Sequence, residues 1–226
     1  LAMELCSDAN LDESGSAVGE PTECALVNDG LKLGLSKTEY AVQYPRIGEA
    51  PFDSGRKMMS TVHTTPDGGI LQFTKGAPDE VLRRCTSVWK DGAAIPMTDQ
   101  LRQEILEANK AMADQALRVL CGAQRIWSQQ PQSYEPEALE QDLCYLGLSG
   151  MIDPIRPEVK DAIVECRAAG IRPIMITGDH RDTAVAIARQ LGILEEGQQA
   201  ITGSQLNDLS DEELARRIHE FSVYAR

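Results

Sequence analysis

The chain has 226 residues and 42% hydrophobic content, enough for a core in one large domain or two modest ones. Its formal net charge of −13 argues against the basic stripe of a nucleic-acid-binding protein and against a polybasic membrane-surface patch. We therefore expect no nucleic-acid partner. ATP stays compatible with this charge, because a phosphate site needs only a few local cations and backbone N–H groups.

The six cysteines are dispersed, without a C-x-x-C pair or a histidine cluster at zinc spacing, so we expect reduced thiols and no metal site. No run approaches 18 consecutive apolar residues, and no basic segment precedes an apolar one at the N-terminus, so no membrane span or signal peptide is expected. Residue 1 is not methionine, and the chain stops directly after a strand-like run. We expect the sequence to be a piece of a longer protein.

The first part of the chain, to about Cys144, mixes short β-rich runs, turn signals and separate helices, which predicts an antiparallel α+β layer. Met58 to Thr64 and Ile70 to Thr74 flank a Pro-Asp-Gly-Gly turn and predict a hairpin. Pro78 is expected near the first position of a helix that follows Gly76.

Further along, Val88 to Ile95 predicts a smaller hairpin that turns at an Asp-Gly pair. Apolar residues recur at helical spacing from Asp99 to Leu117, and a strand is expected from Val119 to Ile126. Ser128 to Glu140 is expected to be a loop.

The pattern changes near Leu143. Leu143 to Ile152 predicts a strand, and Val159 to Cys166 a helix that ends at a glycine. A second strand is expected over Ile171 to Ile176 and a second helix over Thr183 to Leu191; a third helix has Ser210 and Glu213 as its capping box. This alternation is typical of a parallel, doubly wound sheet, so we place a domain boundary at residues 144–150.

Neither a Walker A sequence nor G-x-G-x-x-G is present, so a nucleotide site would have to be built otherwise. Five strings are more informative: residues 19–26 (GEPTECAL), 51–60 (PFDSGRKMMS), 75–79 (KGAPD), 153–159 (DPIRPEV) and 175–179 (MITGD). Together and in this order they resemble P-type cation-transporting ATPases, most closely the calcium-pump branch. The resemblance covers nearly the whole chain.

The resemblance implies an α+β nucleotide-binding domain over residues 1–147, lacking its first strand, and a partial α/β haloacid-dehalogenase-like (Rossmannoid) phosphorylation domain over residues 148–226. The family's phosphorylation motif Asp-Lys-Thr-Gly-Thr and its later Gly-Asp-Gly-x-Asn-Asp motif are both absent, as expected for a fragment between them. The implied cofactors are ATP and Mg²⁺. The implied partners are the transmembrane and actuator domains of the same polypeptide, at the cytoplasmic face of a membrane.

Phe52 lies beside polar residues at the predicted start of a strand, where it is either a core aromatic or a base-stacking side chain. In the resembling pumps the matching Phe stacks on adenine, and a base stack is worth about 1–3 kcal/mol. The neighbouring Arg56 and Lys57 favour stacking.

Lys57 and Lys75 lie near opposite ends of the predicted hairpin, so folding can bring both ammonium groups to one pocket; the alternative is two solvated surface lysines. Gly76 would let a ligand approach the backbone closely, next to a helix N-terminus of positive potential. Glu23 matches a family residue that borders the adenine, and otherwise is an exposed loop acid. Arg118, at a helix-to-strand junction, matches an arginine that reaches the phosphates, and otherwise is a surface arginine.

Thr177, Gly178 and Asp179 follow a predicted strand at the carboxyl edge of a parallel sheet, where such folds bind ligands. The resemblance implies that they hold the transferring phosphoryl group and its metal. Asp153 matches a hinge-side motif that positions nucleotide, and Arg226 matches an arginine near the nucleotide in the closed state. A generic strand-to-helix turn is the alternative for the first three residues.

Calcium is the leading ion, with sodium/potassium or proton transport as the alternative. A soluble haloacid-dehalogenase-type phosphatase is a different class of function, but it needs a D-x-D nucleophile motif, and none precedes Leu143. A third is a regulatory ATP-binding module without a transport role.

Overall fold

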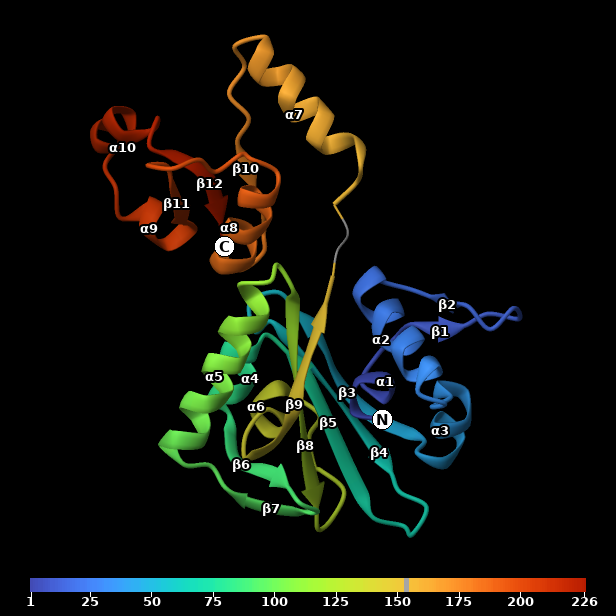
Figure 1. Ribbon diagram of the computed structural model, residues 1–226. Coiled ribbons are helices and arrows are strands. Elements are labelled where there is room, and N and C mark those ends of the chain that lie inside the picture. The colour runs from blue at the N-terminus through green and yellow to red at the C-terminus, as the bar shows by residue number, and fades with distance from the viewer. Residues whose placement is uncertain (153–154) are drawn as a thin grey trace. The chain divides into compact units, whose positions relative to one another are not determined.

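The computed structural model describes residues 1–152 and 155–226. The chain divides into two compact units: Leu1–Glu107 with Val119–Met151, and Ala108–Arg118 with Ile152–Arg226. Figure 1 labels the helices and strands of both. Among the described residues, no helix is both long enough and apolar enough to cross a bilayer.

The first unit is built on a seven-stranded sheet of order β3-β4-β5-β8-β9-β6-β7. Its strands are β3 (Arg46–Asp53), β4 (Met58–Thr64), β5 (Ile70–Gly76), β6 (Cys85–Lys90), β7 (Ala93–Pro96), β8 (Arg118–Trp127) and β9 (Leu143–Met151). The pairs β3–β4, β4–β5, β5–β8 and β6–β7 are antiparallel, whereas β6 and β9 run parallel. The prediction of a mixed α+β layer with a mainly antiparallel sheet is confirmed.

Both predicted hairpins are present. β4 and β5 pair in continuous register from Met58↔Gly76 to Thr64↔Ile70. Their turn needs Gly68, whose φ of 82° lies in the left-handed region. The smaller hairpin, β6–β7, turns at Asp91 and Gly92, which both have positive φ as an Asp-Gly two-residue turn requires.

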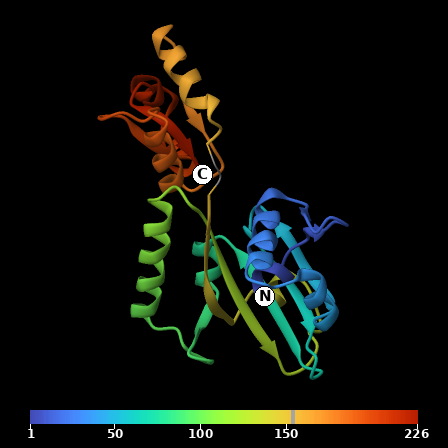
Figure 2. The same ribbon diagram turned by 45° about the vertical axis from the view of Figure 1, so that its right-hand side comes forward.

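Alternation along the central strands sends side chains to two separate cores. Met59 and Phe73 pack with Leu5 on one face, and Met58 packs with Val81 on the other. Figures 1 and 2 both show the blue N-terminal helices on one side of this sheet. These elements are α1 (Ala2–Leu5), α2 (Pro21–Lys32) and α3 (Lys37–Gln43), with a small hairpin of β1 (Asn10–Leu11) and β2 (Ala17–Val18).

Two further helices of this unit are α4 (Pro78–Arg83) and α6 (Pro136–Leu139). Between them, α5 (Asp99–Ala113) has residues 99–107 in the first unit and residues 108–113 in the second. Pro78 is the first residue of α4, as predicted, where its missing N–H costs nothing. The helix predicted to reach Leu117 ends at Ala113, because Ala116 adopts a left-handed φ of 61°. The segment predicted as a loop, Ser128 to Glu140, contains the short helix α6.

The second unit has a three-stranded parallel sheet of order β10-β12-β11, as predicted for parallel strands. Its elements are α7 (Glu158–Ala168), β10 (Met175–Ile176), α8 (Arg181–Gln190), β11 (Gln199–Thr202), α9 (Gly203–Asn207), α10 (Asp211–Arg217) and β12 (Phe221–Ala225). Its core joins α7 and α8 to the sheet through Ile163, Ala184, Ala188 and Val223.

The structure differs from the sequence pattern at three places in this region. Leu143 to Ile152 was expected in the parallel sheet, but Leu143–Met151 forms β9 of the first sheet, and the predicted boundary at residues 147 and 148 lies within it. The predicted strand over Ile171 to Ile176 is reduced to Met175–Ile176, because Pro173 has no N–H for a ladder. Ser210 caps α10 through the N–H of Glu213, while the full reciprocal capping box is at Thr202 and Gln205.

Candidate functional site

Lys75 is a predicted site residue of the first unit whose side chain is buried. It lies next to the last residue of β5, a central strand, and pairs with Met59 of β4 and Gly122 of β8. Only 6% of its surface is exposed. Its Nζ atom donates to Oε1 of Glu23 at 2.5 Å. The alternative of a solvated surface lysine is therefore wrong for Lys75, because a buried ammonium needs such a partner.

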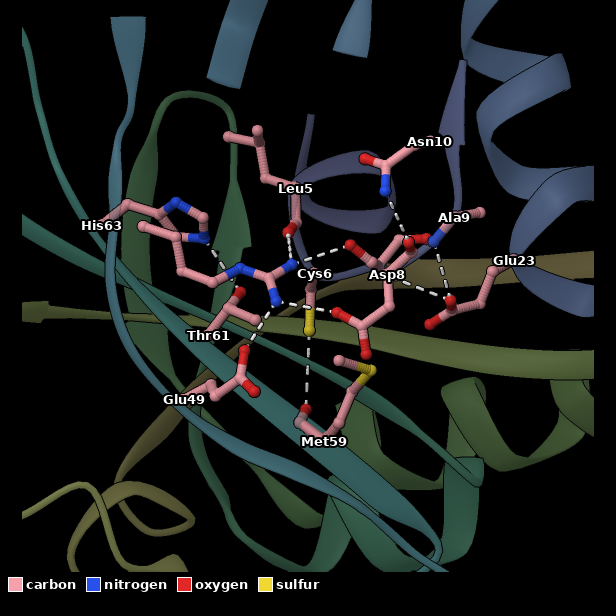
Figure 3. Close-up of polar contacts among 12 residues, drawn as sticks. Leu5, Cys6, Asp8, Ala9, Asn10, Glu23, Glu49, Met59, Thr61 and His63 are labelled. Carbon is pink, nitrogen blue, oxygen red and sulfur yellow. Dashed lines mark hydrogen bonds and ion pairs between the residues drawn. The ribbon is translucent and has the colours of Figure 1, made fainter. Parts of the chain in front are cut away.

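Glu23 belongs to the first turn of α2, where Pro21 starts the helix and the helix dipole favours an acid. Besides Lys75, its carboxylate accepts the backbone N–H groups of Asp8 at 2.9 Å and Ala9 at 3.0 Å. Figure 3 shows Glu23 facing these two residues. Burial alone would raise the pKa of Glu23, but the hydrogen bond and charge of Lys75 outweigh it and lower that pKa. Glu23 is thus a half-buried helical acid rather than an exposed loop acid.

Two further cations, which the sequence patterns did not single out, hold the segment that Glu23 contacts. The buried Nζ of Lys37 donates to the carbonyl oxygens of Ser7, at 2.7 Å, and Ala9. Arg46 donates to the same Ser7 carbonyl at 2.7 Å and pairs with Asp8 at 2.7 Å. These contacts join residues 28 to 39 positions apart, so local spacing carries no signal for them.

Phe52 lies near the end of β3, not at the start of a strand as predicted. It is 63% exposed, so its interpretation as a core aromatic is wrong. β3 and β4 pair at Asp53↔Met58, and β4 and β5 pair at Met58↔Gly76. Phe52, Lys57, Lys75 and Gly76 therefore lie at the same end of three neighbouring strands.

Lys57 forms the last position of the turn between β3 and β4. Its N–H donates to the carbonyl of Asp53 at 2.7 Å, and its φ of 58° is left-handed. The backbone of Lys57 continues into β4, so Lys57 and Lys75, near the two sequence ends of the hairpin, come together at its open end as predicted. Lys57 is half-buried, so it is not a fully solvated surface lysine.

Gly76 is required by the chain itself. A Cβ at this position would lie 2.5 Å from the carbonyl oxygen of Lys57 and 2.5 Å from Cβ of Met58. That same carbonyl accepts the N–H of Ala77 at 2.9 Å, which fixes the strand-to-helix connection. The sequence suggested that this glycine leaves space for a ligand. In the structure it leaves space for the neighbouring strand β4, which approaches it closely.

In the second unit, the structure brings four predicted residues together at the carboxyl end of β10. The hydroxyl of Thr177 lies 3.0 Å from Oδ2 of Asp179 and accepts the N–H of Asp179 at 3.1 Å. The N–H of Arg226, directly after β12, donates to the carbonyl of Asp179 at 3.1 Å. Gly178 is exposed, and no atom outside residues 177–179 lies within 4 Å of the position that a Cβ would take. Backbone N–H groups at such an edge suit an anion.

The two remaining predicted residues are less informative. Arg118 is the first residue of β8, as the predicted helix-to-strand junction requires, and it is exposed. Asp153 lies outside the described residues. Within residues 1–152 and 155–226, no three His, Cys, Asp or Glu side chains are grouped so as to hold a metal ion.

The first unit thus offers an exposed aromatic ring and two lysines at one end of its sheet, with a half-buried acid that pairs with one lysine. Such a set can stack a planar ring and attract phosphate. Comparison with known proteins agrees with the sequence motifs. A family model described as "P-type ATPase, cytoplasmic domain N" matches residues 1–158.

Several curated proteins are similar over nearly the whole chain. Calcium-transporting ATPase 1 of Bacillus cereus is 46% identical over 224 residues, which cover 99% of this chain and 25% of that protein. Calcium-transporting ATPase 1 of Lactococcus lactis is 42% identical over 229 residues, covering 100% and 25%. The plasma membrane-type Calcium-transporting ATPase 4 of Arabidopsis thaliana is 35% identical over 223 residues, covering 97% and 21%. The chain spans about a quarter of the length of these relatives, and it belongs to the P-type ATPase family.

Proposed function

We propose that this chain binds ATP and is part of the cytoplasmic region of an ATP-driven cation pump. The observation that carries the proposal is the exposed Phe52 at the same sheet end as the buried, acid-paired Lys75. The match of residues 1–158 to the model of cytoplasmic domain N of P-type ATPases supports it. Residues 1–147, together with the rest of β9, would form the nucleotide-binding domain, and the remainder of residues 148–226 a part of the haloacid-dehalogenase-like phosphorylation domain.

The residues present fit adenosine nucleotides by their chemistry. An exposed phenylalanine ring offers a base a stacking surface, and Lys57 is accessible to phosphate oxygens. The buried Lys75 adds positive potential to this end of the sheet, although the paired Glu23 carboxylate neutralises much of it. Glu23 uses both carboxylate oxygens inside the protein, so its role would be to orient Lys75 and to border the base through remaining lone pairs. Arg118 would contribute a phosphate contact.

In the second unit, Thr177, Gly178 and Asp179 would form a loop that holds a phosphoryl group and its Mg²⁺, and Asp153 and Arg226 would be further nucleotide-binding residues. The exposed Gly178 leaves its backbone open to an anion, which supports this role. Mg²⁺ binds mainly through phosphate oxygens, water and one or two carboxylates, so Asp179 alone would be enough as its protein ligand. The chain contributes binding and orientation. The aspartate that receives phosphate would belong to the Asp-Lys-Thr-Gly-Thr motif of a longer polypeptide.

Calcium is the ion we propose for the parent pump, because the similar proteins named above are calcium-transporting ATPases. The transmembrane and actuator domains of the same polypeptide would be its partners, and the chain would work at the cytoplasmic face of the membrane. The relatives are about four times as long as this chain, which supports such partners.

The test is an NMR titration of the ¹⁵N-labelled chain with ATP. We expect weak binding, in which millimolar ATP shifts the amide signals around Phe52, Lys57 and Lys75. AMP should shift the signals near Phe52 as well, because the base stack does not need the distal phosphates. Inorganic triphosphate should leave those signals in place. A spectrum unchanged by millimolar ATP would contradict the proposal.

A further inference from the structure

The turn that joins β3 to β4 is held by its own residues. Oδ1 of Asp53 accepts the N–H of Arg56 at 2.8 Å, and the carbonyl of Asp53 accepts the N–H of Lys57 at 2.7 Å. Phe52 enters this turn and Lys57 leaves it. Phe52 and Lys57, two of the proposed nucleotide contacts, therefore depend on the conformation of this turn at the end of the sheet.

The side chain of Arg56 ties this turn to a distant part of the first unit. Its Nη2 atom donates to the carbonyl of Pro51, the residue before Phe52, at 2.6 Å. Its Nη1 atom pairs with Oε1 of Glu140, which lies 84 residues further along the chain. One rigid, planar guanidinium thus links the strand beside Phe52 to a fixed carboxylate.

Glu140 is well placed to act as that fixed point. It directly follows α6, and only 6% of its surface is exposed. The preceding residue, Leu139, is fully buried, and its carbonyl accepts Nε2 of Gln72 in the central strand β5 at 2.9 Å. Arg125 of β8 donates to the carbonyls on either side, those of Ala138 and Gln141. Hydrogen bonds from β5 and β8 therefore hold the segment around α6 in place, and Glu140 at the end of this segment holds Arg56.

The contribution of the Arg56–Glu140 pair to folding stability does not by itself explain why the Glu140 carboxylate is buried. Replacing a buried ion pair by apolar groups of similar volume is often neutral or stabilising, so such pairs are weak devices for folding. They do fix orientation, because each partner restricts the rotamers of the other. Here the restricted element is an exposed turn that bears an exposed aromatic ring.

We infer that Arg56 and Glu140 are positioning residues, which hold the Phe52–Lys57 turn in the conformation that receives the base of a nucleotide. This inference rests on the proposed ATP binding. Neither side chain needs to touch the nucleotide for this role.

The test is a double-mutant cycle on ATP affinity, measured by calorimetry or NMR titration of the whole chain. Glu140→Gln should weaken ATP binding about three- to tenfold, the scale of one lost hydrogen bond. In a Phe52→Ala background the same substitution should change affinity by less than about twofold, because the group it positions is gone. The double variant Arg56→Gln/Glu140→Gln, which leaves no unpaired charge, should match Glu140→Gln.

Asp142→Asn is the matched control. Asp142 lies two residues from Glu140 and is exposed, and it pairs with Arg125 rather than with the turn. This control should keep full ATP affinity. If the unsubstituted chain binds no ATP, the proposed function and this inference both fail. If it binds ATP but Glu140→Gln costs the same with and without Phe52, or costs nothing, the positioning role alone is overturned.

Discussion

Nζ of Lys75 and Oε1 of Glu23 are 2.5 Å apart, although 52 residues separate them in the sequence. The pair joins a central strand to the first turn of α2. Glu23 also receives two backbone N–H groups from the segment that Lys37 and Arg46 hold. The lysine that we assign to the nucleotide pocket is therefore oriented by a polar network inside the protein before any ligand arrives.

We expect Lys75→Met to lower the free energy of unfolding by about 1–3 kcal/mol, because it leaves the Glu23 carboxylate short of its strongest donor. The double variant Lys75→Met/Glu23→Gln should recover part of this loss, since no unpaired charge remains. Urea denaturation followed by tryptophan fluorescence measures it, because Trp89 and Trp127 both lie in the first unit. Equal stability of Lys75→Met and the unsubstituted chain would contradict the pairing.

Amine-directed labelling should distinguish the lysines. Lys75 should react slowly even without nucleotide, because it is buried and paired, whereas Lys57 is more accessible. We expect ATP to slow the labelling of Lys57. The labelling rate of the exposed Lys90, the control, should not change. Peptide mass spectrometry with and without ATP gives the rates. A uniform response of all three lysines would count against a pocket at this sheet end.

Phe52→Ala should weaken ATP binding by about 1–3 kcal/mol, the usual loss for one base stack. Thermal stability should hardly change, because the ring is largely exposed and buries little surface. Ile126→Ala, at another exposed apolar position, should leave both properties unchanged. Calorimetric titration measures the ATP affinity, and thermal unfolding measures the stability. If Phe52→Ala loses stability but keeps its affinity, Phe52 has a structural role and does not stack on the base.

Acid should weaken the first unit through His63. This buried histidine bonds the Tyr44 carbonyl through Nδ1 at 2.9 Å and the Thr61 hydroxyl through Nε2 at 2.9 Å. Burial lowers the pKa of His63; the hydrogen bond to the Tyr44 carbonyl opposes this shift, and the smaller effects of the Arg46 and Lys37 charges add to it. Below about pH 6.5 the unfolded chain therefore takes up a proton that the folded chain does not, and stability falls until the folded pKa is reached.

Urea denaturation at about pH 7.5 and about pH 5.5 measures this effect. His63→Gln should show a smaller drop between the two conditions than the unsubstituted chain. The exposed His219→Gln serves as the control and should behave like the unsubstituted chain. The histidine assignment is wrong if the His63 variant loses as much stability on acidification.

This chain should form no acid-stable phosphoenzyme and show no steady ATP hydrolysis, even with Mg²⁺ and calcium present. Its sequence contains no Asp-Lys-Thr-Gly-Thr motif. Asp179, the acid at the predicted phosphoryl loop, is engaged with the Thr177 hydroxyl. Incubation with γ-labelled ATP and acid quench is the measurement, and stable label on Asp153 or Asp179 would overturn the assigned roles.

Local elements were largely predictable from the sequence because their causes are local. The Pro-Asp-Gly-Gly and Asp-Gly turns need backbone freedom that only particular residues give, and Pro78 marks a helix start by its missing N–H. For the strand β9, however, a long-range pairing decided. The apolar run of β9 fits either sheet by composition, and its pairing with β6 selected the first sheet.

The sequence by itself therefore determined the family, the order of motifs and most element positions, because motif identity and turn chemistry are encoded in contiguous residues. Only the tertiary structure decided that Phe52 is exposed and that Lys75 is buried against Glu23. The tertiary structure also showed that Gly76 is needed because β4 lies close to it, and that Arg56 pairs with Glu140. Burial and ion pairing depend on which distant segments meet, and no local pattern records that.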